Sequence, residues 1–287
     1  MKIYTKVKDL QKDLMAYSKF GKSIGFVPTM GYLHEGHQKL LNEARKENDI
    51  VVLSIFVNPL QFGPNEDLDT YPRDFARDEQ VAKASGVDYI FYPSVEEMYP
   101  KTPCVKVFVT EKSDVLCGSK RPGHFDGVVT VVTKLFHIVQ PTRAYFGLKD
   151  AQQAAIIDSL VADFNFPIEI VKVDIVRESD GLAKSSRNVY LTEEERQEAP
   201  LIYKGLKQLK ESVAKGQMNP FDLKQALCTF YETNLHGQID YVEILSYPDL
   251  KPISTLIGQT ALVAVAYKYS KARLIDNVLI QGGKETK

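Results

Sequence analysis

Short apolar runs alternate with helix-length segments as far as about residue 175 of the 287-residue chain. The runs that we expect to form strands are residues 24–27, 50–57, 89–92, 144–147 and 168–173. Strands separated by helices favour a parallel sheet, because each parallel connection needs a crossover that covers one face of the sheet. The pattern therefore predicts an α/β fold, with a doubly wound, Rossmann-like parallel sheet over residues 1–175.

One apolar segment, residues 128–139, fits two kinds of secondary structure. Its apolar residues follow helical spacing, whereas its many β-branched side chains would suit a strand. We predict a helix, because twelve residues are long for a buried strand.

The pattern changes in the last third of the chain. A threonine three residues before a glutamate begins a helix that we expect over residues 192–215, and an Asn-Pro pair begins a second over residues 219–234. Strand-like runs follow at residues 241–245, 261–267 and 278–280. We therefore expect a smaller C-terminal α+β domain over residues 176–287, entered through residues 177–186.

Charge and cysteine content exclude several classes of protein. The chain carries 36 basic and 37 acidic residues, so no overall field draws it onto nucleic acid or an anionic membrane. Its three cysteines form no C-x-x-C pair, which argues against a disulfide framework and a structural zinc site. The N-terminus lacks the apolar core of a signal peptide, and no stretch approaches the roughly 20 apolar residues of a membrane span. We expect a cytoplasmic protein.

The segment Pro-Thr-Met-Gly-Tyr-Leu-His-Glu-Gly-His, residues 28–37, joins an expected strand to an expected helix. His34 and His37 would lie side by side at the helix N-terminus, where free backbone N–H groups favour a phosphate. Gly36 between them would allow a close approach of the backbone to the ligand. Two other interpretations stay open, a zinc-ligating pair and a merely exposed pair of histidines.

Three further clusters carry groups suited to an anionic nucleotide and a small polar substrate. Asn58 and Gln61 follow the strand that ends near residue 57; a polar strand-end turn is the alternative. Residues 147–153 offer a cation, a carboxylate and two amides, or simply a solvated helix start. Residues 184–188 offer two cations and two hydroxyls for a mobile phosphate clamp, or a charged linker.

These residues carry a family resemblance. The H-x-G-H signature is similar to that of the nucleotidyltransferases related to class I aminoacyl-tRNA synthetases, and residues 184–187 are similar to their mobile lysine-serine loop. Over nearly its whole length the chain resembles the pantothenate synthetase family, the pantoate-β-alanine ligases. The matching stretches are residues 28–37, 56–63, 71–73, 121–128, 145–153, 185–188 and 273–277. Leu148 and Lys184 depart from the family pattern, where a polar residue and a methionine are usual.

The resemblance implies a two-step reaction. ATP and (R)-pantoate would form pantoyl adenylate and pyrophosphate, and β-alanine would then attack the activated carbonyl to give pantothenate and AMP. It further implies Mg²⁺, a homodimer, and two possible roles for His37, proton donor or electrostatic stabiliser. Segment 128–139 could contribute to the dimer interface, with core burial as the alternative.

The resemblance also assigns residues to roles. Catalysis would involve His34, His37, Lys149 and Arg187. The predicted ATP-binding residues are Met30, Gly31, His34, His37, Gly147, Leu148, Lys149, Asp150, Val176, Lys184, Ser185, Ser186 and Arg187. The predicted substrate-binding residues are Asn58, Gln61, Arg121 and Gln153, and Asp78 would hold Mg²⁺. A different adenylyltransferase of the same superfamily and a non-catalytic nucleotide sensor are the rival hypotheses.

Overall fold

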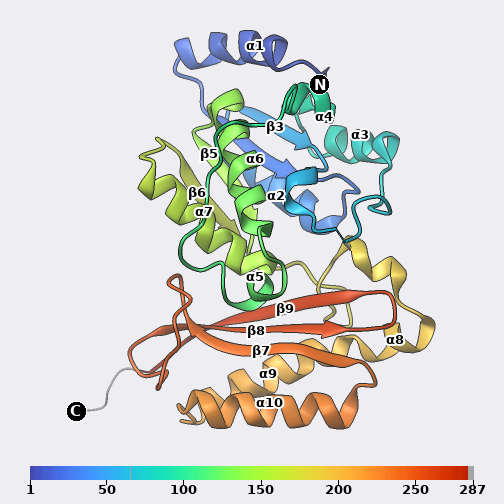
Figure 1. Ribbon diagram of the computed structural model, residues 1–287, viewed down its shortest axis with the longest axis vertical. Coiled ribbons are helices and arrows are strands. Elements are labelled where there is room, and N and C mark those ends of the chain that lie inside the picture. Colours follow the sequence, from blue (N-terminus) through green and yellow to red (C-terminus); the bar gives the residue numbers. More distant parts are fainter. Residues whose placement is uncertain (65, 284–287) are drawn as a thin grey trace. The chain divides into compact units, whose positions relative to one another are not determined.

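The computed structural model describes residues 1–64 and 66–283, which form two compact units (Figure 1). Unit 1 comprises residues 1–113, 118–148 and 156–174, and unit 2 comprises residues 114–117, 149–155 and those from 175 onward. The chain thus passes into unit 2 one residue before the boundary expected from the sequence. The segments 114–117 and 149–155, which the prediction assigned to the first domain, belong to unit 2.

Unit 1 is built on a six-stranded sheet in the order β1-β4-β3-β2-β5-β6, and every pair in it is parallel. The strands are β1 (Lys2–Tyr4), β2 (Ile24–Thr29), β3 (Ile50–Ile55), β4 (Tyr89–Phe91), β5 (Arg143–Gly147) and β6 (Glu169–Val173). The five predicted strands are confirmed. β1 was not predicted, because it is a three-residue edge strand with two exposed residues. The strand order reverses at β2 and β5, which is where doubly wound sheets bind ligands.

Helices cover both faces of this sheet. α1 (Val7–Lys19), α6 (His124–Val139) and the later turns of α7 (Ala151–Asp163) pack on one face. α2 (Glu35–Glu47) and α3 (Phe75–Ala84) pack on the other. The shorter helices are α4 (Val95–Met98), α5 (Leu116–Lys120), η1 (Pro59–Gln61) and η2 (Leu148–Asp150). The predicted helix at residues 128–139 is confirmed within α6, and it is buried on nearly all sides.

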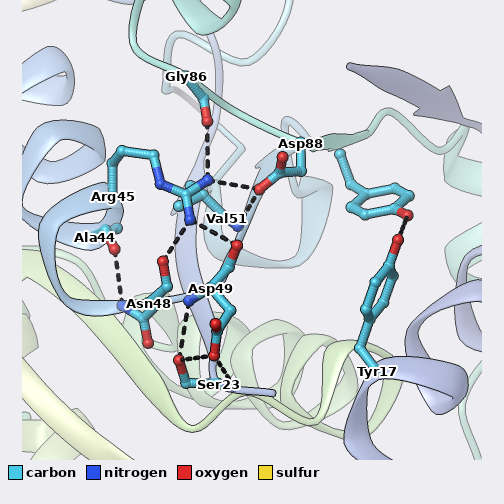
Figure 2. A network of polar contacts seen from close by, with 10 residues as sticks. Tyr17, Ser23, Ala44, Arg45, Asn48, Asp49, Val51, Gly86 and Asp88 are labelled. Atoms are coloured by element: carbon cyan, nitrogen blue, oxygen red, sulfur yellow. Dashed lines mark hydrogen bonds and ion pairs between the residues drawn. The ribbon is translucent and has the colours of Figure 1, made fainter. Parts of the chain in front are cut away.

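A polar network joins the amino ends of β2, β3 and the turn before β4 (Figure 2). The Arg45 guanidinium donates to the Asp88 carboxylate at 2.7 Å and to the carbonyl oxygen of Asp49 at 2.7 Å. The Asp49 carboxylate in turn accepts from the backbone N–H and the hydroxyl of Ser23 at 2.9 and 3.0 Å. These contacts hold the amino ends of the strands together, at the opposite end of the strands from the carboxyl ends.

Unit 2 contains an antiparallel sheet in the order β7-β8-β9, formed by β7 (Gln238–Ser246), β8 (Thr260–Lys268) and β9 (Arg273–Gln281). α9 (Pro200–Ala214) and α10 (Pro220–Asn234) lie along one face of it (Figure 1). The first turn of α7 and residues 115–116 contribute to the apolar cluster that includes Leu262 and Ala264. β9 begins five residues earlier than the predicted strand 278–280.

The single helix predicted over residues 192–215 is wrong. The capping box of Thr192 and Glu195 is present, but the helix it opens, α8 (Glu193–Glu198), ends before Pro200, which starts α9. Proline has no N–H to continue the hydrogen-bond ladder of α8, whereas it is well suited to the first position of a new helix.

Candidate active site

The two histidines of the H-x-G-H segment lie at the start of α2, directly after the carboxyl end of β2. His34 is the N-cap, and its Nδ1 accepts the backbone N–H of Gly36 at 3.1 Å. The backbone N–H of His34 donates to Nδ1 of His37 at 3.2 Å, and the ring centroids are 4.1 Å apart. The rings are therefore side by side, held by a reciprocal cap rather than by helical spacing alone.

The cap defines which ring nitrogen carries the proton. Each Nδ1 faces a backbone N–H, which can only donate, so each Nδ1 must accept. The hydrogen-bond network thus assigns the neutral tautomer with the proton on Nε2 to both rings.

Gly36 leaves room for the imidazole ring of His34. A Cβ atom at this position would lie 2.7 Å from Cε1 of the His34 ring. Glycine is needed so that the imidazole of His34 can fold over the helix start. The expected close approach of a ligand is not required to explain it.

Asp78 shapes the loop before the histidines. Its side chain is 1% exposed, and its two carboxylate oxygens accept the backbone N–H groups of Tyr32 and Leu33 at 2.8 and 2.6 Å. Burial raises the pKa of Asp78 above its ordinary value, although both N–H donors oppose this shift. The carboxylate therefore supports the loop, and its predicted role as a magnesium ligand stays a prediction.

Gln61 ends η1 at the carboxyl side of β3. Asn58, which is 1% exposed, donates from Nδ2 to Oε1 of Gln61 and to the carbonyl oxygen of Gly127, both at 3.1 Å. The Oδ1 atom of Asn58 accepts from Tyr99 at 2.9 Å and from the backbone of Leu60. The buried amide of Asn58 therefore orients Gln61, and its predicted contact with substrate stays a prediction.

η1 lies directly against α6, because Gly127 has no side chain. A Cβ atom at this position would lie 2.2 Å from the carbonyl oxygen of Leu60. Any other residue would push η1, and Gln61 with it, away from the helix.

Arg121 supports Gln61 from the backbone side. Its guanidinium pairs with both carboxylate oxygens of Glu66, with Nε at 2.8 Å from Oε1, and it also reaches the Gln61 carbonyl oxygen at 3.4 Å. Burial raises the pKa of Glu66, but the bond and charge of Arg121 outweigh it, so that the net pKa is lowered. Because its charge is paired with Glu66, Arg121 positions the Gln61 turn, and its predicted contact with substrate stays a prediction.

His124 completes this support. Nη1 of Arg121 lies 2.9 Å from Nε2 of His124, and arginine can only donate. Nε2 therefore accepts, and the remaining nitrogen, Nδ1, donates to the Gln61 carbonyl oxygen at 2.8 Å. Neither His124 nor Glu66 was singled out from the sequence, because only the fold brings them to Gln61.

A cavity of about 500 Å³ lies within unit 1 at the carboxyl ends of β2, β3 and β4. Its lining includes Met30, Gly31, Phe56, Arg73 and Tyr92. The volume falls in the range of small-molecule pockets. The loop that carries two predicted ATP-binding residues, Met30 and Gly31, therefore borders an open cavity.

The remaining predicted nucleotide-binding residues of the β5 end are divided between the units. Gly147 ends β5 and Leu148 follows it in unit 1, whereas Lys149 and Asp150 belong to unit 2. The Lys149 ammonium lies 3.3 Å from the Asp150 carboxylate. Gln153, two residues beyond the start of α7, is half-buried, and its amide has no hydrogen-bond partner among the residues that the structure describes.

The lysine-serine loop follows a hairpin of residues 176–184 in unit 2. Arg177 and Ala183 form an antiparallel bridge, and the N–H of Lys184 donates to the carbonyl oxygen of Val176 at 2.9 Å. The Lys184 ammonium pairs with Glu178 across the hairpin at 2.7 Å. Beyond it, Ser185 caps η3 (Ser186–Tyr190) by accepting the N–H of Arg187 at 3.2 Å.

Neither a cluster of metal-ligating side chains nor a membrane-spanning helix is found in the described chain. Within residues 1–64 and 66–283, no three His, Cys, Asp or Glu side chains are grouped so that they could hold a metal ion. The zinc interpretation of His34 and His37 therefore lacks a third ligand there. Over the same residues, every helix is too short or too polar to cross a membrane.

Comparisons with known proteins agree on one family. The pantoate-β-alanine ligase model matches residues 2–279. The pantothenate synthetase of Geobacillus sp. (strain WCH70) is 60% identical over 280 residues, which cover 98% of this chain and 99% of the relative. The pantothenate synthetase of Bacillus cereus (strain ZK / E33L) is 58% identical over 280 residues, with the same coverage.

Solved structures lead to the same family. The crystal structure of pantothenate synthetase from Thermus thermophilus superposes with a TM-score of 0.90 at 44% identity, covering 97% of this chain and 99% of that one. Pantoate-β-alanine ligase from Francisella tularensis, solved with β-γ ATP and β-alanine, gives a TM-score of 0.81 at 35% identity, covering 97% of both chains. With its fold, its paired histidines and these relatives in agreement, the chain belongs to the pantoate-β-alanine ligase family.

Proposed function

We propose that the protein condenses (R)-pantoate with β-alanine in an ATP-dependent reaction that passes through pantoyl adenylate. A carboxylate is a poor electrophile, and adenylation supplies a leaving group for the attacking amine. The proposal is supported above all by the paired histidines at the point where the strand order reverses, in a chain of this family. It is also supported by the ATP and β-alanine bound to the Francisella tularensis relative.

His34 and His37 would meet the phosphates of ATP at the N-terminus of α2. The Nε2–H assigned to each ring makes it a neutral hydrogen-bond donor, so His37 can stabilise charge on the reacting phosphate without first becoming an imidazolium. Protonation of Nδ1 would instead break the cap, because the backbone N–H of His34 would lose its acceptor.

Cations from unit 2 would complete phosphate binding. A helix N-terminus contributes about 0.3–1 kcal/mol towards an anion, whereas a hydrogen bond to a charged group contributes about 1.5–3 kcal/mol. A triphosphate therefore needs Lys149, Lys184 and Arg187 in addition to the histidines. Lys184 would have to exchange Glu178 for phosphate, which suits a loop that acts only when ATP is bound.

Other residues of unit 2 and the end of β5 would hold the rest of the nucleotide. The backbone of Gly147, Leu148 and Val176, the hydroxyls of Ser185 and Ser186, and the Asp150 carboxylate are the groups that we assign to it. Asp150 is suited to the ribose hydroxyls, because a carboxylate is a strong acceptor.

Gln61 and Gln153 would hold pantoate by its hydroxyls, and Gln61 would also contact β-alanine. The amide of Gln61 is oriented by Asn58, and that of Gln153 has no partner of its own in the described chain. Both are therefore amides whose remaining donors and acceptors can serve a small polar substrate.

Mg²⁺ would enter as part of the substrate, MgATP. Phosphate oxygens are ligands that Mg²⁺ prefers, and the ion lowers the charge on departing pyrophosphate. We assign the carboxylate of Asp78 to the loop rather than to the ion, because both oxygens accept loop N–H groups.

The homodimer and the cytoplasmic location stay predictions. The apolar residues of α6 at 128–139 are buried in the core of the chain itself, so they are not available for an interface. Light scattering would test the dimer by showing one or two times the chain mass of 32.4 kDa.

The function is tested by following the two half-reactions separately. Pyrophosphate should be released from MgATP only when (R)-pantoate is present, and AMP with pantothenate should appear only after β-alanine is added. Pyrophosphate release that needs neither substrate would contradict the assignment and point to another adenylyltransferase.

A further inference from the structure

Two neighbouring polar residues, Asp276 and Asn277, lie in the otherwise apolar middle of β9. Their side chains are 4% and 5% exposed. Successive strand residues point to opposite faces of a sheet, so the two contact different layers of unit 2. Asp276 pairs with Val265, which belongs to the cluster with α9 and α10, and Asn277 pairs with Ala264, which packs with the start of α7.

On one face, Asp276 holds the base of the hairpin 176–184. Its carboxylate accepts two bonds from the Arg177 guanidinium, at 2.6 and 2.9 Å. Arg177 also donates to the carbonyl oxygen of Gly181 at 3.1 Å and stacks on the Tyr203 ring, 3.4 Å from its centre. A bidentate pair of this kind fixes the direction as well as the position of the hairpin.

On the other face, Asn277 holds the lysine of the β5 end. Its Nδ2 donates to the backbone carbonyl oxygen of Lys149 at 3.0 Å, and its own N–H donates to Oδ1 of Asp276 at 2.7 Å. One hydrogen bond therefore links the contacts of Asp276 with those of Asn277. The backbone of Lys149 and the hairpin that leads into residues 184–187 are therefore both held by two neighbouring residues of β9.

We propose that Asp276 and Asn277 are positioning residues that set Lys149 and the loop of residues 184–187 in register for the phosphates of ATP. This inference rests on the proposed function, because it assigns both segments to the nucleotide. Neither residue is assigned to the substrate. They hold the two cationic segments in place before ATP binds, so that ordering these segments does not cost binding free energy.

The experiment measures pyrophosphate release against ATP concentration at saturating pantoate and β-alanine, and against pantoate concentration at saturating ATP. Asn277→Ala removes the bond to Lys149, and Asn277→Asp keeps the shape but places an acceptor against the carbonyl oxygen. Both should raise the KM for ATP about tenfold, the value of one hydrogen bond, and leave the KM for pantoate within about twofold. Asp276→Asn should raise the KM for ATP by acting on the hairpin.

Asn48→Ala is the matched control. Asn48 is 7% exposed in unit 1 and donates to the carbonyl oxygen of Ala44 at 2.8 Å and to the Tyr145 hydroxyl at 2.7 Å, so its loss removes buried hydrogen bonds without touching either segment. This variant should keep the wild-type KM for ATP. A wild-type KM in Asn277→Ala, or an equal change in Asn48→Ala, would overturn the inference. Failure of the wild-type protein to release pantoate-dependent pyrophosphate would instead overturn the proposed function.

Discussion

The backbone N–H of His34 donates to the ring nitrogen Nδ1 of His37 at 3.2 Å. One histidine therefore holds the other in the tautomer that presents Nε2–H as a donor. The signature thus has a structural role beside its proposed chemical role, and substitutions can separate the two.

Replacing His37 should reduce adenylation far more than it reduces stability. We expect His37→Ala to lower kcat for pantoate-dependent pyrophosphate release by roughly 10²- to 10³-fold, the usual effect of losing a transition-state donor. His37→Gln should retain more activity, because its amide N–H can reach the place of Nε2–H. Loss of the cap should cost His37→Ala about 1 kcal/mol of unfolding free energy, whereas the amide oxygen of His37→Gln can still accept the N–H of His34. Equal activity of the two variants would show that the donor is not what matters.

The role of the Asp78 carboxylate can be tested by measuring how its replacement changes the Mg²⁺ requirement and the stability of the protein. In Asp78→Asn one of the two loop N–H groups should lose its acceptor, which costs about 1–3 kcal/mol for a buried group. We expect a lower kcat and a lower urea midpoint, while the Mg²⁺ concentration for half-maximal rate stays at the wild-type value. A raised Mg²⁺ requirement would restore Asp78 as a metal ligand.

Local signals were sufficient to predict much of unit 1. β2 and α2 follow from an apolar run, a turn and apolar positions at helical spacing, all within residues 24–47. The break at Pro200 could also have been predicted, since proline inside an expected helix is a stop signal. The three-residue β1 could not, because its partner β4 lies more than 80 residues away and supplies the pairing.

The surroundings of the candidate site depend on contacts that spacing does not reveal. Gln61 is held by residues from 3 to 63 positions away in the sequence. An Asn-Gln or Arg-His combination in a loop has no periodic signal, so the part that Asn58 and Arg121 play in orienting Gln61 was not predicted. Asp276 and Asn277 gave one usable sign, two adjacent polar residues in an apolar strand.

Acid should weaken the Asp49 contact at the amino edge of the sheet (Figure 2). Hydrogen bonds from Lys22 and from Ser23 lower the pKa of Asp49 from 3.8 to about 2. Because the folded-state pKa is lowered, the stabilisation is complete above about pH 4 and is lost as the pH falls towards 2. Urea midpoints of the wild-type protein and Asp49→Asn should differ at pH 7 and converge by about pH 3 to 2. A difference between the two urea midpoints that does not change with pH would refute this. The activity at pH 7 should be similar in the two proteins.

Gln153 should determine how tightly pantoate binds. Its half-buried amide has no partner within the described residues, so truncation removes substrate contacts without breaking a bond within the protein. We expect Gln153→Ala to raise the KM for pantoate roughly tenfold and to leave the KM for ATP and the urea midpoint nearly unchanged. Gln153→Glu, which has the same shape, should be worse, because its charge would repel the pantoate carboxylate while it loses the N–H donors.

The neighbouring Gln152 is the contrast: it is 5% exposed, and its amide donates to the carbonyl oxygen of Val115 and accepts from the N–H of Cys117. Gln152→Ala should therefore lower the urea midpoint. A rise in the KM for pantoate in Gln152→Ala but not in Gln153→Ala would contradict the assignment of Gln153 to pantoate.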